Sequence, residues 1–212
     1  MIDHTPELAD SVYALVCDPS GNRLVAGDSK ARVTVLDTKD LATTESVVNV
    51  HQGEVNVWSL ALMDSPHAIL SGNSDGYVRR WVPKDAGWSG TGKGKILPTS
   101  ADDAKVNPTI NSVAYNAKYG WVAAGGVGPS VEIYDKDLHH LRSLSGHDGT
   151  IWWVTFDPQG SRLAYGGLDG IVRVVDIAVM RHLDDGVPAD LFHASQLETG
   201  LSVQYNSIVR LR

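Results

Sequence analysis

The sequence of 212 residues has only one cysteine, Cys17, so an internal disulfide bond is excluded. Cys17 lies in the apolar stretch VYALVC, and we expect it to fill space in the core rather than act as a nucleophile. The first 25 residues contain no apolar run long enough for a signal peptide or a membrane span. These absences predict a cytoplasmic protein with no membrane partner.

The sequence also lacks a block of basic residues, and its formal net charge is -7. Clustered lysines and arginines supply the attraction for a phosphate backbone, so nucleic acid is not an expected partner. The isolated histidines, including His139-His140, have no cysteine or carboxylate at metal-ligand spacing, so we predict neither a metal site nor a cofactor. The pairs Arg79-Arg80 and Lys93/Lys95 are expected on the exposed surface.

A helical hydrophobic period is nearly absent until the end of the chain. There the stretch PADLFHASQLETG, residues 188–200, has apolar residues at amphipathic spacing, and Gly200 can end a helix. The last stretch, LSVQYNSIVRL, has the character of a strand. We therefore predict an all-β protein with a short C-terminal helix and a terminal strand in residues 187–212.

What the sequence does contain is a repeat. Four stretches share an apolar strand, a polar turn, a second apolar strand, a tight turn with glycine and a third, alternating strand: SVYALVCDPSGNRLVAGDSKARVTVLD, EVNVWSLALMDSPHAILSGNSDGYVRRWV, TINSVAYNAKYGWVAAGGVGPSVEIYD and TIWWVTFDPQGSRLAYGGLDGIVRVVD. With Val12, Val55, Ile110 and Ile151 as equivalent first-strand positions, the spacings are 43, 55 and 41 residues. A period of about 40–45 residues is typical of a four-stranded propeller blade, and the longer spacing indicates an insertion.

The residue types support this interpretation. The segments VTVLD, VEIYD and VRVVD are rich in β-branched residues that alternate between two environments. Turn residues separate the strands, namely Asp18-Pro19-Ser20-Gly21, Asp157-Pro158-Gln159-Gly160, Asp75-Gly76 and Asp169-Gly170.

On these motifs the chain resembles the WD40 (Trp-Asp) repeat β-propellers over roughly residues 11–180. The resemblance implies a single propeller-like domain over 1–212, with blades at 11–50, 54–100, 109–146 and 150–184 and an insertion at 84–95 in the second blade. His51, Ser71, Asp75 and Trp81 fall on the positions of the structural hydrogen-bond tetrad of that family. In the family this network is buried, so it must be fully satisfied to be stable.

Ser, His and Asp together also invite comparison with a hydrolase. The resembled geometry pins the group to a tryptophan between strands and gives it no oxyanion donors, so we predict no catalytic residues and no enzyme. The tetrad is degenerate elsewhere in the chain. The fourth blade keeps His147 and Asp169 with Tyr165 and Val175 at the other two positions, and the first and third blades have Lys30 and Gly128 in place of the turn aspartate, with Leu36 and Tyr134 at the tryptophan position.

The resemblance implies rings that most often have seven blades, although propellers in general run from about four to eight. Four blades of WD40 geometry are therefore expected to leave a gap, with apolar faces exposed on the end blades. The predicted outer strands are TTESVVNV, KGKILPTS, HHLRSLSG and IAVMRHLDD. Three arrangements would cover the apolar faces of the end blades: a homodimer of half-rings, a partner chain that completes the ring, or a longer protein of which this chain is the C-terminal part.

A glycine-rich stretch in the second blade has Gly87 and Gly92-Lys93 in a near match to the phosphate-binding pattern GxxxxGK[ST]. Gly94 replaces the hydroxyl residue that holds magnesium, and Ile96-Leu97-Pro98 follows in place of a helix. We therefore expect a flexible loop between strands rather than a nucleotide site.

The resemblance also implies a binding surface. Residues beside each first-strand position lie on the top face around the channel in WD40 proteins, which here gives Ser11, Tyr13, Glu54, Asn56, Thr109, Asn111, Thr150 and Trp152. Tyr13 and Trp152 are the strongest candidates, because aromatic side chains dominate interface hot spots. Trp152 could equally cover its neighbour in the ring. We predict a non-enzymatic scaffold for protein partners, with self-assembly as the alternative.

Overall fold

The computed structural model describes residues 10–40, 43–47, 56–63, 68–84, 87–95, 109–178 and 209–210. Within these ranges sixteen strands form four antiparallel sheets of four strands each, and every sheet takes its strands in chain order. No helix in this part of the chain is long and apolar enough to cross a membrane. The predicted all-β class and the four-bladed plan are confirmed.

The strand bounds follow the repeat. The first sheet contains β1 (Val12–Cys17), β2 (Arg23–Asp28), β3 (Val33–Asp37) and β4 (Thr43–Val47). The second contains β5 (Val57–Leu62), β6 (Ile69–Asn73), β7 (Tyr77–Lys84) and β8 (Gly87–Lys95). The third contains β9 (Ile110–Asn116), β10 (Trp121–Gly126), β11 (Val131–Asp135) and β12 (His140–Leu144). The fourth contains β13 (Ile151–Phe156), β14 (Arg162–Gly167), β15 (Ile171–Asp176) and β16 (Val209–Arg210).

The hydrophobic core is divided among the junctions between neighbouring sheets. One cluster joins the first and second sheets around Val57, one joins the second and third around Ile110, and one joins the third and fourth around Ile151. The second strands β6 and β10 are buried along their whole length, because neighbouring sheets cover both of their faces. Small residues such as Gly72 and Gly125 let the sheets approach closely there.

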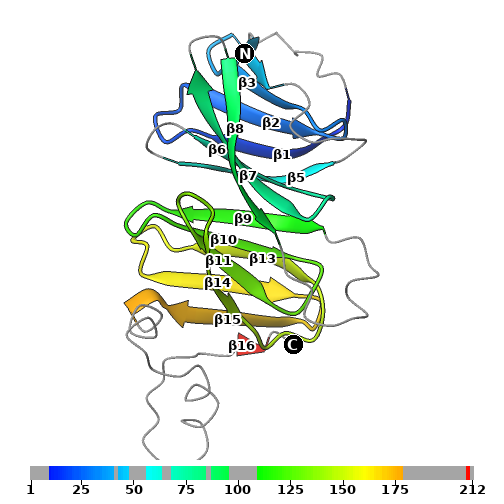
Figure 1. Cartoon of the computed structure of the whole chain (residues 1–212), viewed down its shortest axis with the longest axis vertical. Coiled ribbons are helices and arrows are strands. Elements are labelled where there is room, and N and C mark those ends of the chain that lie inside the picture. The colour runs from blue at the N-terminus through cyan, green and yellow to red at the C-terminus, as the bar shows by residue number, and fades with distance from the viewer. Residues whose placement is uncertain are drawn as a thin grey trace, which may run out of the picture.

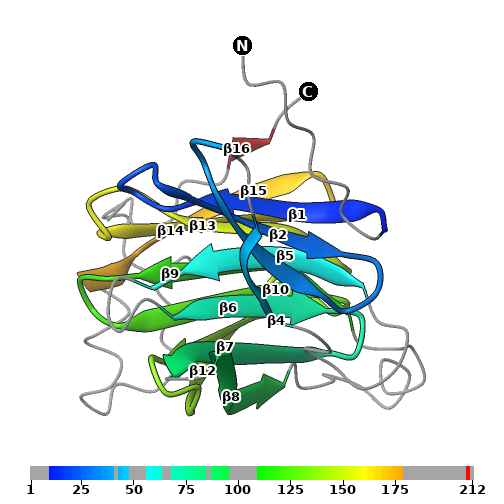
Figure 2. The same cartoon turned by 90° about the horizontal axis from the view of Figure 1, so that it is seen from above.

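The four sheets follow one another along the longest axis of the molecule, with the first and fourth at opposite ends (Figure 1). In the view from above, the first two sheets lie in front of the third and fourth (Figure 2). The inner strands β1, β5, β9 and β13 neighbour one another in that order. The arrangement is therefore an open series of blades, as expected for an incomplete ring.

Two outer strands differ from the prediction. Residues 87–95, expected as a glycine-rich loop, form β8, which pairs with β7 from Tyr77↔Lys95 to Lys84↔Gly87. The loop interpretation of this stretch was wrong, because backbone pairing with β7 stabilises a strand that has no apolar alternation of its own. The outer strand of the fourth sheet is β16 rather than IAVMRHLDD, and it pairs through Ile171↔Arg210 and Val172↔Val209.

Cys17 is exposed at the end of β1, contrary to the expectation of a core position. The apolar stretch around it is the inner strand of the first sheet, and in the part of the chain that the structure describes only the second sheet packs against it. The predicted C-terminal helix, residues 188–200, lies outside the described residues.

Candidate functional site

Each inner strand carries a β-bulge at the same place, near its start. In β1 the pairing steps from Val12↔Asp28 to Ala14↔Gly27, so Tyr13 is an extra residue without a partner in the ladder. The same step leaves one extra residue in the other three inner strands, namely Trp58 in β5, Asn111 in β9 and Trp152 in β13. We call Tyr13, Trp58, Asn111 and Trp152 the bulge row.

A bulge turns the extra side chain away from the regular alternation of the strand. The three aromatic members of the bulge row are exposed, whereas Val57 and Ile151, which directly precede two of them, are buried. A backbone hydrogen bond fixes each bulge in the same way, from the amide after the second strand to the carbonyl that precedes the inner strand. The pairs are Ser29 to Ser11, Ser74 to Asn56, Val127 to Thr109 and Leu168 to Thr150.

These equivalences correct the predicted register of the second sheet. The residue that corresponds to Val12 is Val57, which pairs with Asn73 as Val12 pairs with Asp28, and not Val55. Asn56 is therefore the residue before this position, and the bulge residue is Trp58, which the sequence analysis missed. Glu54 lies outside the described residues.

The bulge row makes contacts along its length. The rings of Tyr13 and Trp58 lie 4.7 Å apart between centroids and are tilted by 36°. The side-chain amide of Asn111 donates a hydrogen bond of 3.0 Å to the carbonyl of Ile151 in the next inner strand. Thus Tyr13 and Trp58 present a joint aromatic surface, whereas Asn111 also ties β9 to β13.

Part of the predicted tetrad is present in the second sheet. The indole of Trp81 donates a hydrogen bond of 3.0 Å to the hydroxyl of Ser71, which is fully buried. The Asp75 carboxylate forms an ion pair with Arg79 at 2.7 Å and accepts a hydrogen bond from the backbone amide of Tyr77. His51 lies outside the described residues.

The fourth sheet holds the equivalent histidine and aspartate in contact. Nδ1 of His147 lies 2.8 Å from the carboxylate of Asp169, and the His147 ring packs edge-on against Tyr165. Tyr165 stands at the serine position of the family pattern, and Nε2 of His147 is buried with no hydrogen-bond partner among the described residues. Burial raises the pKa of Tyr165 to about 12, which keeps its hydroxyl neutral.

The contact with His147 also affects the pKa of the Asp169 carboxylate. Burial opposes its ionisation, but hydrogen bonds from His147 and from the backbone of Ile171 and Asp148 outweigh that effect and lower its pKa to about 2. A carboxylate with a lowered pKa stabilises the fold above its ordinary value of 3.8, and that contribution is lost as the pH falls through 2. The group therefore stabilises the hairpin between β14 and β15 at neutral pH.

Replacing Asp169 by asparagine is expected to lower the free energy of unfolding at pH 7 by about 1.5–3 kcal/mol, because a charged hydrogen-bond acceptor is lost. The difference from the wild-type chain should shrink between pH 4 and pH 2, where the wild-type carboxylate takes up its proton. Thermal unfolding measured from pH 7 to pH 2 tests this. The exposed neighbour Asp148, changed to asparagine, is the control and should follow the wild-type curve. A constant difference over the whole range contradicts the assignment.

The third sheet has a different polar cluster in place of the tetrad. Glu132 is fully buried on β11 and accepts hydrogen bonds from Ser130 at 2.7 Å and Ser143 at 2.5 Å. Nε2 of His140 lies 2.7 Å from the same carboxylate, and the His140 ring meets Tyr134 edge-on. Burial and the charge on Glu132 together raise the pKa of Tyr134.

Ser143, His140 and Glu132 include the residue types of a hydrolase triad. In such a triad the histidine uses one ring nitrogen for the acid and the other for the nucleophile. Here Nε2 of His140 faces both Glu132 and Ser143, and the Ser143 hydroxyl donates to Glu132 directly. This geometry does not pass a proton from serine to histidine, so the cluster joins β11 to β12 and is not a catalytic triad.

Arg79 and Arg80 are mostly buried, contrary to the expectation of free surface charges. Arg79 pairs with Asp75 within the second sheet, whereas Arg80 reaches the third sheet, where it contacts Asp137 at 2.7 Å and the carbonyl of Lys136 at 2.7 Å. Sequence alone did not identify these partners, because Arg80 and Asp137 lie far apart along the chain.

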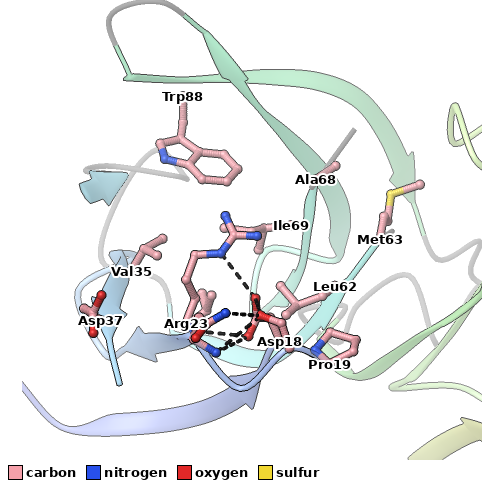
Figure 3. Close-up of a pocket in the computed structure, with 13 residues that line it drawn as sticks. Asp18, Pro19, Arg23, Val35, Asp37, Leu62, Met63, Ala68, Ile69 and Trp88 are labelled. Atoms are coloured by element: carbon pink, nitrogen blue, oxygen red, sulfur yellow. Dashed lines mark hydrogen bonds and ion pairs between the residues drawn. The ribbon is translucent and has the colours of Figure 1, made fainter. Parts of the chain in front are cut away.

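A cavity of about 600 Å³ lies between the first and second sheets, beyond the end of β1. Figure 3 shows the indole of Trp88 at one end and the pair formed by Asp18 and Arg23 at the other. The Asp18 carboxylate accepts hydrogen bonds from Ser20, Asn22 and Arg23. It therefore stabilises the turn between β1 and β2. No bulge-row residue lines this cavity.

Two segments, residues 43–81 and 138–176, match the family described as WD domain, G-beta repeat. The first begins at β4 and the second just before β12, the outer strands of two sheets, and each ends on the third strand of the next sheet, β7 or β15. The sequence repeat therefore spans the junction between two sheets.

The chain is similar to several curated proteins. WD repeat-containing protein VIP3 of Arabidopsis thaliana is 27% identical over 145 residues, which are 66% of this chain and 42% of that protein. THO complex subunit 6 homolog of Danio rerio is 24% identical over 174 residues, 78% of this chain and 53% of that protein. WD repeat and HMG-box DNA-binding protein 1 of Xenopus laevis is 27% identical over 175 residues, 80% of this chain and 15% of that protein. The chain thus spans about half of these relatives' length or less.

Proposed function

This chain is a WD40 repeat protein, and on that premise we propose that it is a non-enzymatic scaffold that binds a protein partner through the bulge row. The observation that carries the proposal is the alignment of four equivalent bulges, three of which expose an aromatic side chain. Each of these inner strands is paired with the second strand of its sheet, so the side chains are held on a rigid base. A partner meets a surface that is already in its binding geometry.

The residue types of the bulge row suit protein recognition. Tyrosine and tryptophan supply a large contact area with few rotatable bonds, so little entropy is lost when a partner binds. The contact between Tyr13 and Trp58 further restricts both rings before binding. Such a pair can hold an aliphatic, aromatic or guanidinium side chain of a partner peptide.

Polar residues beside the bulge row supply hydrogen-bonding groups to this surface. Thr150 and Asn56 precede the bulges of β13 and β5, and both are partly exposed. We assign them to the rim of the binding surface, together with Asn111. Glu54 stays a prediction from sequence, as does a cytoplasmic location.

Replacing Tyr13, Trp58 and Trp152 together by alanine is expected to weaken partner binding at least about thirtyfold, since hot-spot truncations cost about 2 kcal/mol or more. The measurement is a quantitative pull-down from an extract of the source cells, followed by titration of the captured partner. Because all three side chains are exposed, the triple variant should keep the wild-type circular dichroism spectrum.

The matched control is Leu141→Ala, which removes an exposed apolar side chain from the outer strand β12, away from the bulge row. This variant should bind partners as the wild-type chain does. The proposal is wrong if the triple variant retains every partner at unchanged affinity.

The sequence also allowed self-assembly or membership of a longer protein. Self-assembly depends on other residues, at the two ends of the series of sheets, and it leaves the bulge row available to partners.

A further inference from the structure

One interlocking contact recurs at all three internal junctions between sheets. The first residue of each inner strand packs against a glycine in the second strand of the preceding sheet. The pairs are Val57 on Gly27, Ile110 on Gly72 and Ile151 on Gly125. A Cβ atom added to these glycines would lie 2.6, 2.5 and 2.5 Å from the γ-methyl group of the facing residue. We call the first residue the knob and the glycine the socket.

At two of the three junctions a second side chain accompanies the knob, three residues further along the inner strand. Val113 and Val154 approach the sockets Gly72 and Gly125 to 3.0 Å from the same hypothetical Cβ atoms. Both valines are almost fully buried, as are the knobs that precede them. Knob and socket therefore recur at all three junctions, and a companion joins them at the second and third.

The first sheet carries a knob and a companion with no socket. By strand register, Val12 is equivalent to Val57, and Leu15 is equivalent to Val113 because it pairs with the corresponding position of the second strand. Val12 is 38% exposed and Leu15 is 62% exposed, whereas their equivalents are buried. These two side chains have the right spacing for a socket.

The fourth sheet carries a socket with no knob. Gly166 is the equivalent glycine, because it pairs with Trp153 directly after the bulge, as Gly125 pairs with Ser112. A Cβ atom on Gly166 would meet nothing closer than the Ile171 carbonyl oxygen at 3.4 Å, which belongs to its own sheet. Among the described residues, no knob fills this socket.

The residue beside the socket differs between this end and the internal junctions. Ser59 and Ser112 accept hydrogen bonds from the backbone of Val113 and Val154, the companions of the next sheet. The equivalent residue in the fourth sheet is Trp153, which is 74% exposed. A sheet docked on this end would bring its companion residue to the Trp153 indole, and Leu15 offers a larger apolar contact there than valine does.

We propose that the fourth sheet of one copy of this chain docks on the first sheet of a second copy, with Val12 in the Gly166 socket and Leu15 against Trp153. A second copy is the occupant because one chain carries both halves of the contact, and the residues that the structure describes leave each half unfilled. Two copies joined reciprocally bury both ends and give a closed ring of eight sheets, within the range known for propellers. The proposal does not depend on the bulge row.

The test measures the mass of the chain in solution by analytical ultracentrifugation over a range of concentrations. A species of two chains is expected, and a species of one chain at all concentrations overturns the proposal.

Two variants then locate the junction. Val12→Asp with Leu15→Asp removes the knob side, and Gly166→Ala fills the socket with a methyl group that the isolated sheet accommodates. Each variant is expected to weaken association at least tenfold while the circular dichroism spectrum is unchanged. An equal mixture of the two variants should associate more tightly than either variant alone, since the knob of one still fits the socket of the other at one of the two junctions.

The control is Trp58→Ala, which alters the bulge row in the second sheet and should leave the two-chain species intact. Failure of the mixture to associate overturns the knob-and-socket junction, as does association that survives both variants. Loss of partner binding in the bulge-row variant with unchanged mass separates the two proposals.

Discussion

Replacing Glu132 by alanine is expected to destabilise the chain by roughly 3 kcal/mol or more, one of the two largest effects we foresee. The substitution removes a buried side chain and leaves Ser130, which is buried, without its acceptor, at about 1–3 kcal/mol for an unpaired buried group. His140 and Ser143 lose their partner at the same time, so the pairing of β12 with β11 also weakens. Chemical denaturation monitored by tryptophan fluorescence gives the free energy of unfolding.

Glu132→Gln separates volume from charge in this cluster. Glutamine fills the same space and retains one carbonyl acceptor, but its amide group cannot accept from the second donor. We expect an intermediate loss of stability. If Glu132→Ala unfolds at the wild-type denaturant concentration, the cluster does not hold the outer strand of the third sheet.

Replacing the knob Ile151 by alanine is expected to lower the free energy of unfolding by about 2–5 kcal/mol, the usual range for a large aliphatic residue in a close-packed site. Ile151 is fully buried in the Gly125 socket, so the sheets cannot easily close the space that is left. The same measurement, made at a concentration where the chain is monomeric, reports this loss directly.

Two valines give a matched comparison for the same contact. Val57→Ala removes a buried knob, whereas Val12→Ala removes the equivalent side chain from the open end. We expect a loss of about 1.5–3 kcal/mol for Val57→Ala and a change within about 0.5 kcal/mol for Val12→Ala in the monomer. Equal losses would show that Val12 is packed within its own chain.

Much of the fold could be predicted from local patterns. The β-branched strands and the turns around Asp75-Gly76 and Asp169-Gly170 lie where the repeat placed them. The bond between Ser71 and Trp81 follows from the same offsets. These features are encoded within a few residues, so a single repeat suffices to recognise them.

The binding surface could be predicted only in part, for a physical reason. In EVNVWSL both Val55 and Val57 are valines of the same strand parity, and a shift by two residues leaves the alternation unchanged. Only the pairing of Val57 with Asn73 decides between them, and pairing with the second strand is a long-range property. Trp58 was missed because of this shift.

The outer strands and buried charges show the same limit. The β8 segment GWSGTGKGK has no hydrophobic alternation, and it is a strand because β7 lies beside it. Arg80 and Asp137 meet because two sheets are adjacent. Contacts of this kind depend on the tertiary arrangement, which local residue patterns do not specify.

The pairing of β16 with β15 has a consequence for the order in which the chain acquires its structure. The first three sheets draw all four strands from continuous stretches, so each can close while later parts are still being synthesised. The fourth sheet is complete only when Val209 and Arg210, more than thirty residues beyond β15, have been made, and pairing segments so far apart along the chain carries an added entropic cost. During that interval the backbone of β15 is an unprotected sheet edge, the kind of edge from which aggregation begins. Ribosomal pausing or premature termination just after residue 178 therefore exposes the chain at its most vulnerable stage.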